Sequence, residues 1–515
     1  MSAAEEYDYV VVGAGTAGSV LAARLSEDPD VRVLVLEAGG SFVPAAVDRA
    51  PLWFTLLGSR VDWGYRTVPQ PGLNGRVVYE PRGKLPGGSS NLYIMMHIRG
   101  HASDFDNWAY QGAAGWAYAD LLPYFAKLEA TQTVTPAEPD ANLMSRVFLD
   151  AAEEAGHPRT GDFNGPQMIG AGWHHVNVRD GERRGALRSY LEPALDRPNL
   201  TVRTDAYAAK LVVEHGKCVG VDYRQQAPVA AEGEGRTLGT DAREPGDHRV
   251  RATREVLVCL GAIESPKLLQ LSGIGPAPLL RQHGIEVKSE LPGVGENFHN
   301  HVLTGLIAET ADPVAPGRQN LSEAAVFTRS QPGLIAPDLQ LAFVHVPFDI
   351  IVGQSHPNAV SILPGVVRPN SRGSVRLASA DPFAAPLIDP NYLGDRSDVT
   401  RMVEAVKLSR DIFAAPAFKP FLKGELLPGA EVRTDREIEQ FVRERADCYH
   451  HQAGSCRIGV DDLAVVDPEL KVRGVAGLRV VDASVMPAVP SGNCHAAIAA
   501  IAERAADLIK EGQHA

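Results

Sequence analysis

The sequence is short of cysteine, of long apolar runs and of basic charge, and each shortage excludes a class of protein. Five cysteines occur among 515 residues, with no CxxC pair, which argues against a disulfide scaffold and favours reduced thiols in the cytoplasm. No apolar run reaches about 18 residues and no basic segment precedes an apolar one at the N-terminus, so we expect neither a membrane span nor a secretion signal. A net charge of −13 offers no global basic surface for nucleic acid or anionic membranes.

The composition indicates a folded protein with a sizeable core. Hydrophobic residues make up 44% of the chain and charged residues 22%, close to the averages of globular proteins. The length suits two or three domains or one large interleaved unit. There are 49 glycines and 37 prolines without a repeating pattern, which indicates many loops and close backbone approaches. No internal repeat and no coiled-coil heptad occurs.

The first 40 residues predict a strand, a glycine-rich turn, a helix and a second strand. Residues 9–12 (YVVV) form a short continuous apolar run, as expected of a strand buried on both faces of a parallel sheet. A G-x-G-x-x-G turn follows at 13–18, residues 19–25 have helical apolar spacing, and 31–36 (VRVLVL) is the second strand. Together they predict a right-handed βαβ unit.

Each residue of this turn has a physical task in binding a dinucleotide. Gly13 permits the tight turn, Gly15 lets a pyrophosphate approach the backbone, and Gly18 lets the helix pack close to the sheet. The N–H groups at the helix N-terminus attract the phosphates. Glu37, at the end of the second strand, can accept hydrogen bonds from a ribose 2′-OH and would repel a phosphate there. The pattern therefore predicts FAD or NAD rather than NADP, and does not separate the first two.

The rest of the chain alternates between strands and helices without a clear order. Residues 199–221 suggest two or three strands of an antiparallel hairpin or meander, and the polar segment 225–251 suggests an exposed loop. Further strands are expected at 255–260, 339–346 and 478–481, and helices at 265–271, 401–413, 435–446 and 496–510.

Several longer motifs resemble the signatures of the glucose–methanol–choline (GMC) flavoprotein oxidoreductases, in family order and over nearly the whole chain. The first signature corresponds to residues 82–90 (RGKLPGGSS), running on to Arg99-Gly-His101 and residues 104–108 (DFDNW). The second corresponds to residues 261–275 (GAIESPKLLQLSGIG). Other similar segments are 292–297 (PGVGEN) with His301, 451–459 (HQAGSCRIG), 466–468 (VDP) and 481–487 (VDASVMP).

This resemblance implies an α/β fold, α+β overall, with two interleaved domains. A Rossmann-like FAD-binding domain would comprise the discontinuous segments 1–150, 186–300 and 436–515, with an excursion near 45–80. A substrate-binding domain built on an antiparallel sheet would comprise 151–185 and 301–435. The metal prediction is none, because the adjacent histidines at 174–175 and 299/301 lack matching Cys or carboxylate ligands.

The resemblance also implies which residues surround the cofactor, expected to be FAD. Two glycines and two hydroxyls at 87–90 suit a loop beside the flavin, and Asp482 is expected either to contact the cofactor or only to cap a turn. The expected cofactor-binding residues are Gly13, Gly15, Thr16, Ala17, Gly18, Glu37, Ala38, Arg82, Gly87, Gly88, Ser89, Asn91, Leu92, Tyr93, Ala208, Asp482, Ala483, His495 and Ala496.

Three positions depart from the family pattern. Leu92 stands where some members carry the histidine that binds FAD covalently, so we expect non-covalent binding. Tyr93 replaces the usual Asn close to the flavin, which leaves the local hydrogen bonding and oxygen access open. Asn300 replaces the usual Asp before His301.

His451 and His495 are the expected catalytic pair among 16 histidines. His451 occupies the position of the family's catalytic histidine, and we assign His495 to a second active-site position where members carry His or Asn. An imidazole with a pKa of roughly 6.5 suits a base that takes the hydroxyl proton while hydride passes to flavin N5. His450 is expected to be structural, His97 and His101 stay unassigned, and Cys456 and Cys494 are expected to pack rather than react.

The first hypothesis for the function is FAD-dependent oxidation of a primary or secondary alcohol, by an oxidase or a dehydrogenase. A hydroxynitrile-lyase-like enzyme or a photodecarboxylase on the same scaffold is the alternative, and a non-catalytic nucleotide-binding protein is a third class. Sugars, amino sugars, aromatic alcohols and polyols remain open as substrates, with the acidic balance leaning faintly towards a cation. Oxygen or another electron acceptor would be the second partner, and a monomer or homodimer is expected.

Overall fold

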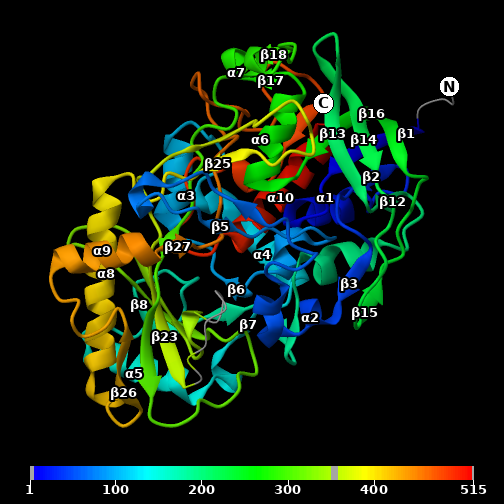
Figure 1. Cartoon of the computed structure of the whole chain (residues 1–515). Helices are drawn as coiled ribbons and strands as arrows, with labels where there is room; N and C mark the ends of the chain where they lie inside the picture. Colours follow the sequence, from blue (N-terminus) through cyan, green and yellow to red (C-terminus); the bar gives the residue numbers. More distant parts are fainter. Residues whose placement is uncertain (1–4, 350–355, 357, 513–515) are drawn as a thin grey trace.

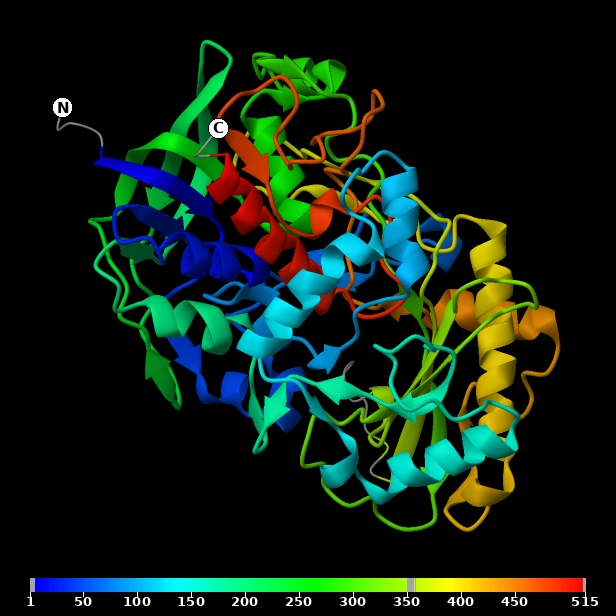
Figure 2. The ribbon, with the colours of Figure 1, turned by 180° about the vertical axis from the view of Figure 1, so that it is seen from behind.

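Two β-sheets lie in opposite halves of the molecule and draw on different parts of the chain (Figure 1). The computed structural model describes residues 5–349, 356 and 358–512. The half with the first sheet contains both the first strand and the last helix, although these lie at opposite ends of the sequence (Figures 1 and 2). The chain therefore passes repeatedly between the two halves, as the resemblance implied.

The first sheet is the parallel sheet that the opening residues predict. Its strands are β12 (Leu200–Arg203), β2 (Val33–Leu36), β1 (Glu5–Val12), β16 (Gly246–Val258) and β28 (Leu478–Val480), with β14 (Lys217–Gln225) and β13 (Ala206–Glu214) added antiparallel along the first half of β16. Val10, Val11 and Val12 are completely buried, because neighbouring strands flank β1 and helices cover its faces. The βαβ prediction is confirmed.

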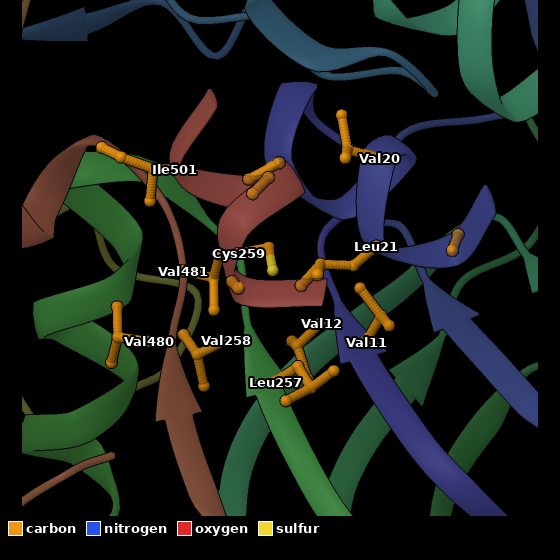
Figure 3. Close-up of a cluster of buried hydrophobic side chains, with 14 of the residues drawn as sticks. Val11, Val12, Val20, Leu21, Leu257, Val258, Cys259, Val480, Val481 and Ile501 are labelled. Carbon is orange, nitrogen blue, oxygen red and sulfur yellow. The ribbon is translucent and has the colours of Figure 1, made fainter. Parts of the chain in front are cut away.

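Helices α1 (Thr16–Leu25) and α10 (His495–Glu511) pack against each other over the carboxyl ends of these strands. Val20, Leu21 and Ile501 belong to the same buried cluster as the side chains at the ends of β1, β16 and β28, and Figure 3 shows Leu21 on the side of α1 nearer to these strand ends. Helix α4 (Tyr118–Thr131) packs on α10 from the other side. The packing brings the first and last helices to one edge of the sheet, where ligands of such folds bind.

The second sheet is antiparallel. Its strands are β26 (Leu422–Leu427), β20 (Leu306–Thr310), β23 (Ala359–Val366), β22 (Leu339–Val344), β21 (Ala324–Thr328) and β8 (Gly170–Trp173), with β19 (Val302–Leu303) and β27 (Asp447–Cys448) paired at the side. One face packs on α5 (Leu143–Glu154), α8 (Arg396–Ala414) and α9 (Asp435–Arg445). The opposite face carries a separate apolar cluster, because side chains alternate along each strand.

The structure corrects several expectations about single segments. Residues 225–251 are not one loop: they contain β15 (Gly235–Thr237), and β16 already begins at Gly246. Of the antiparallel hairpin or meander expected at 199–221, the hairpin is present as β13 and β14, whereas β12 pairs in parallel with β2. Helix α6 (Gly261–Leu271) begins four residues early. Helix α9 and strand β27 pack with the second sheet, beyond the predicted boundary at 436, because α9 buries its apolar side against α8.

The remaining helices and strands are short. They include β3 (Phe42–Pro44), α2 (Ala45–Asp48), β4 (Tyr65–Arg66), β5 (Tyr79–Glu80), β6 (Met96–His97), α3 (Ala102–Tyr110), β7 (Thr135–Pro136), β9 (His175–Val176), β10 (Val178–Arg179), β11 (Glu182–Arg183), β17 (Ile274–Gly275), α7 (Ala277–Gln282), β18 (Ser289–Glu290), β24 (Ser374–Arg376) and β25 (Leu387–Asp389). Over the described part of the chain, no helix combines the length and apolar character needed to cross a bilayer. All five cysteines are buried and free.

Candidate active site

The glycines of the first turn are fixed by close backbone contacts. Gly13 has φ of +98°, and a Cβ there would lie 2.7 Å from the carbonyl oxygen of Cys259. A Cβ on Gly18 would lie only 1.8 Å from the carbonyl oxygen of Gly13, so α1 can approach β1 this closely only with glycine. At Gly15 the nearest atom would be 3.9 Å away. The first and third glycines therefore shape the turn, and the second leaves space above it for a ligand.

A pocket opens above this turn. Many of the expected cofactor residues line it, namely Gly13, Gly15, Thr16, Ala17, Glu37, Ala38, Arg82, Gly88, Ser89, Asp482 and Ala483. Other lining residues were not predicted: Trp63, Tyr65, Gly83, Cys259, Leu260, Gly261, Ala262, Ile263, Glu264, Gln452, Cys494 and Ile498. The pocket thus joins the first turn, the 82–89 loop, the start of α6 and the segment before α10, which lie far apart in sequence.

Glu37 closes one side of the pocket and also holds the turn in place. Its buried carboxylate accepts hydrogen bonds from the backbone N–H of Ala14 at 2.9 Å and of Gly39 at 2.8 Å. Burial raises the pKa of Glu37 despite these bonds. Each oxygen still has a lone pair for a ribose hydroxyl, as expected of the acidic residue in a dinucleotide site.

Asp482 is a buried hub between the ends of two strands. Its carboxylate accepts bonds from the N–H of Gly261 at 2.9 Å, the hydroxyl of Ser265 at 2.6 Å and the N–H of Ser484 at 2.8 Å. It thus caps the start of α6 and the turn after β28, and it also lines the pocket. The capping role of Asp482 is therefore present, and its contact with the cofactor stays a prediction.

An aromatic and charged cluster also lines the pocket, and it combines Glu264 and Lys267 of the second signature with Trp63, Tyr65 and Tyr207, which belong to no motif. Tyr65 donates to the carboxylate of Glu264 at 2.6 Å, and Trp63 stacks on the ring of Tyr65 with centroids 5.6 Å apart. Lys267 lies 3.2 Å from the same carboxylate and 2.9 Å from the hydroxyl of Tyr207. Flat aromatic walls with a fixed carboxylate suit the stacking and hydrogen bonding of a purine nucleoside.

The remaining expected cofactor residues lie behind this lining or beside it. A Cβ on Gly87 would lie 2.6 Å from the amide of Asn91, which itself donates to the carbonyl of Pro86 at 2.6 Å. Leu92 is buried, and its side chain has no atom that could bond covalently to a flavin. The others outside the lining are Gly18, Tyr93, Ala208, His495 and Ala496. Asn91 and Gly18 therefore shape the loops rather than face the pocket.

His451 is held at the junction of the two halves by three side chains. Its Nδ1 lies 2.9 Å from Nδ1 of His301, and its Nε2 lies 3.2 Å from the amide nitrogen of Asn493. The ring of Tyr449 stacks on it, with centroids 4.9 Å apart and an interplanar angle of 19°. Its backbone N–H donates to Asn300 at 2.8 Å.

This network fixes the proton positions of the dyad. With the amide nitrogen of Asn493 as the donor, Nε2 of His451 is the acceptor and Nδ1 of His451 carries the proton donated to His301. Burial lowers the pKa of His451 well below its usual value, and the pKa of His301 to about 3. The imidazole of His451 is therefore neutral, with a free base facing Asn493.

The expected pairing of His495 with His451 is not what the structure shows. His495 is the first residue of α10 and contacts Gln132 at 3.1 Å, Thr16 at 3.4 Å and the ring of Tyr93, whose centroid is 4.6 Å away. Asn493, two residues earlier, provides the partner of His451. Sequence reasoning missed it because Asn493 and His495 both match a His-or-Asn position, and only the chain geometry decides between them.

The other histidines take structural positions. His450 has a left-handed φ of +65°, contacts the thiol of Cys448 at 3.1 Å and gives its carbonyl to Arg82 at 2.8 Å. His97 pairs with Glu129 at 3.0 Å, and His101 caps α3. Within the described ranges, no group of three or more His, Cys, Asp or Glu side chains is arranged to hold a metal ion.

A glycine-lined dinucleotide pocket beside a buried histidine base defines a dinucleotide-dependent oxidoreductase. Two models of the GMC oxidoreductase family match residues 7–303 and 369–502. The chain belongs to this family, is an enzyme acting on CH–OH donors, and has FAD as its cofactor, as the sequence predicted. The glycine cradle, the Glu37 carboxylate and the aromatic cluster fit this group.

The named relatives include alcohol-oxidising enzymes with different substrates. The chain is 40% identical to mitochondrial choline dehydrogenase of Homo sapiens, over 98% of this chain and 90% of that protein. Oxygen-dependent choline dehydrogenase of Brucella ovis is 38% identical, over 98% and 95%. Among solved structures, pyridoxine 4-oxidase from Mesorbium loti has a TM-score of 0.90 at 33% identity, covering 99% of both chains. Aspergillus oryzae formate oxidase has a TM-score of 0.89 at 26% identity over the full length of both chains.

Proposed function

We propose that the enzyme oxidises a primary or secondary alcohol to the carbonyl compound, with His451 as the general base. The observation that carries this proposal is the unprotonated Nε2 of His451, held by His301 on one side and facing Asn493 on the other. The bound FAD supplies the hydride acceptor. Every other function in this step falls to side chains of the chain itself.

An alcohol oxygen that enters between Asn493 and His451 would meet two matched groups. The amide nitrogen of Asn493 donates to the alcohol oxygen, and Nε2 of His451 accepts the hydroxyl proton. His301 keeps the proton on Nδ1 of His451, so that Nε2 stays available as the acceptor. After proton transfer, the bond to His301 lets the new positive charge spread towards a second imidazole.

The proposal excludes a catalytic role for His495 as the partner of His451. His495 instead connects Thr16 of the dinucleotide turn with Gln132 and Tyr93, so its position supports the cofactor pocket. The amide of Asn493 takes over the orienting role that the sequence assigned to His495.

The experiment is to mix the purified holoenzyme with single alcohols in the absence of oxygen and to follow the visible absorbance of the flavin. The panel contains choline, pyridoxine, benzyl alcohols, sugars, amino sugars and polyols. We expect at least one primary or secondary alcohol to bleach the flavin. Cleavage of cyanohydrins without bleaching by any alcohol would overturn the proposal in favour of a lyase.

A further inference from the structure

Gln340 lies on the face of the second sheet that carries the separate apolar cluster. Its side-chain amide is buried and has no hydrogen-bond partner. Its side chain is 0% exposed, and neither its Oε1 nor its Nε2 has a hydrogen-bond partner. A buried amide left unpaired costs on the order of 1–3 kcal/mol, so such a group in a folded protein calls for an explanation.

The strand register places Gln340 on this face without ambiguity. Gln340 is directly opposite Phe327 of β21 and Gly365 of β23. Directly opposed residues of antiparallel strands point to the same side of a sheet. The next two positions of β22 on that side belong to the apolar cluster, which we call the inner cluster: Met96, Ile98, Phe163, Met168, Leu321, Ala325, Phe327, Ala342, Val344 and Leu363.

Gly365, which lies opposite Gln340, leaves space for an aromatic ring that contacts the catalytic base. A Cβ on Gly365 would lie 2.6 Å from the ring of Tyr449, so the tyrosine ring occupies the space that a larger side chain would fill. The same ring stacks on His451. Gln340 therefore stands beside Tyr449, and a single aromatic ring separates it from the base.

The inner cluster also reaches the second residue of the proposed site. A Cβ on Gly492, the neighbour of Asn493, would lie 2.6 Å from the side chain of Ile98 and 3.5 Å from that of Met168. The hydroxyl of Tyr449 and the carbonyl oxygen of the Asn493 side chain are buried without partners, like the amide of Gln340. Unpaired polar atoms of Tyr449 and Asn493, which both contact His451, thus lie next to the inner cluster.

We propose that Gln340 binds a second, uncharged hydrogen-bonding group of the alcohol substrate, remote from the carbon that is oxidised. The inner cluster contains only Met, Ile, Phe, Leu, Ala and Val side chains, so it favours an apolar or aromatic substrate body. An amide offers two donors and an acceptor, which suits a carboxamide, a hydroxyl or a ring nitrogen. A quaternary ammonium group forms no hydrogen bonds and would leave this amide unpaired.

The test uses pairs of benzyl alcohols that match in shape and differ in one polar group. Each pair carries either a carboxamide or an isopropyl group, at the meta or para position, and kcat/KM is measured for both members. We expect the natural enzyme to prefer the carboxamide in at least one pair. Gln340→Met should lower kcat/KM for that substrate about 10- to 100-fold and leave the isopropyl partner within a few-fold.

The control is Gln225→Met, a buried glutamine of the first sheet that also has an unpartnered amide oxygen. It should leave the substrate preference unchanged. Gln340→Asn keeps the amide but shortens its reach, so it should lose the preference while retaining FAD. If Gln340→Met does not fold, Gln340→Asn decides the test. Binding of the matching methyl ethers, followed by the flavin spectrum, reports the preference without turnover.

The inference rests on the proposed function, and its failure is distinguishable from failure of that function. If no alcohol bleaches the flavin, alcohol oxidation itself is wrong. If both benzyl alcohols are oxidised and the carboxamide preference is absent, or persists unchanged in the Gln340 variants, alcohol oxidation stands and the assignment of Gln340 is overturned.

Discussion

The cofactor side and the substrate side of the site are built in opposite ways. On the cofactor side, the carboxylates of Glu37 and Asp482 already accept hydrogen bonds from backbone and hydroxyl donors of the protein. On the substrate side, the amide of Gln340, the hydroxyl of Tyr449 and the side-chain oxygen of Asn493 are buried with no partner. The polar groups of the cofactor pocket are therefore held in place by the chain itself, whereas those of the substrate side have no partner in the protein and are left for a ligand.

The largest expected effect comes from the base that lies between the two sides. His451→Ala should lower the rate of flavin reduction by an alcohol about 100- to 10,000-fold, because it removes the imidazole that faces Asn493. The FAD content should stay that of the natural enzyme, since His451 does not line the cofactor pocket. Stopped-flow absorbance under anaerobic conditions measures the rate.

His450→Asn is the matched control for His451→Ala. Asparagine tolerates the left-handed backbone of His450, and its rate of flavin reduction should stay within a few-fold of the natural enzyme. Full activity of His451→Ala would sink the assignment of the base.

Substitutions of Asn493 and His495, two residues apart, test the substrate side and the cofactor side separately. Asn493→Ala should lower kcat/KM about 10- to 100-fold through loss of the donor to the alcohol oxygen, with FAD still bound. His495→Ala removes the contacts to Gln132 and Thr16, so it should weaken FAD retention more than it slows reduction of the FAD-loaded fraction. FAD per chain and single-turnover rates separate the two effects, and the reverse pattern would restore His495 as the catalytic partner.

The cofactor side should respond to a single methyl group. In Gly18→Ala, a Cβ with ideal geometry would lie only 1.8 Å from the carbonyl oxygen of Gly13, which is a severe clash. Helix α1 must therefore move away from β1. We expect a loss of about 1–3 kcal/mol in the free energy of unfolding and lower FAD content. Gly161→Ala, exposed and with nothing within 4 Å, is the control and should change neither. Equal stability of the two variants would contradict the role assigned to Gly18.

The cofactor side and the substrate side also differ in how far the sequence predicts them. The turn at Gly13–Gly18 and the carboxylate of Glu37 were readable because their tasks depend on backbone geometry at short sequence spacing. Trp63 and Glu264 meet in the lining of the pocket through tertiary packing, and no spacing rule joins them. The exchange of His495 for Asn493 has the same cause, since a shift of two residues at the start of α10 changes which side chain reaches His451.

The substrate side was the least predictable part, for a related reason. Gln340 appeared only as one polar residue in an alternating strand, and its unpaired amide depends on the register with Phe327 and Gly365. Register depends on which face of each strand is buried and on the turns between strands, so one polar residue in a strand does not reveal its cross-strand neighbours.

The smallest effect that we expect per residue is on the pH dependence of the free energy of unfolding. The buried histidines contribute to it below pH 6.5. Burial lowers the pKa of His174 to about 4 and that of His301, His450 and His495 to about 3, against roughly 6.5 in the unfolded chain. Below pH 6.5 the unfolded state therefore binds protons that the native state refuses, so stability falls as the pH is lowered towards 4. Above pH 6.5 these groups are neutral in both states and contribute no pH dependence.

Each such histidine should add a slope of up to about 1.4 kcal/mol per pH unit in this window. Asp447, whose pKa is raised to about 6 by burial, acts in the opposite direction between pH 6 and 4 and offsets part of the loss. Urea unfolding with excess FAD at pH 7.5 and 5 measures the difference. His174→Phe should reduce it and the exposed control His215→Asn should not, because only a histidine buried in its neutral form links folding to proton release. An unchanged slope in His174→Phe would show that its ring is already protonated in the native state.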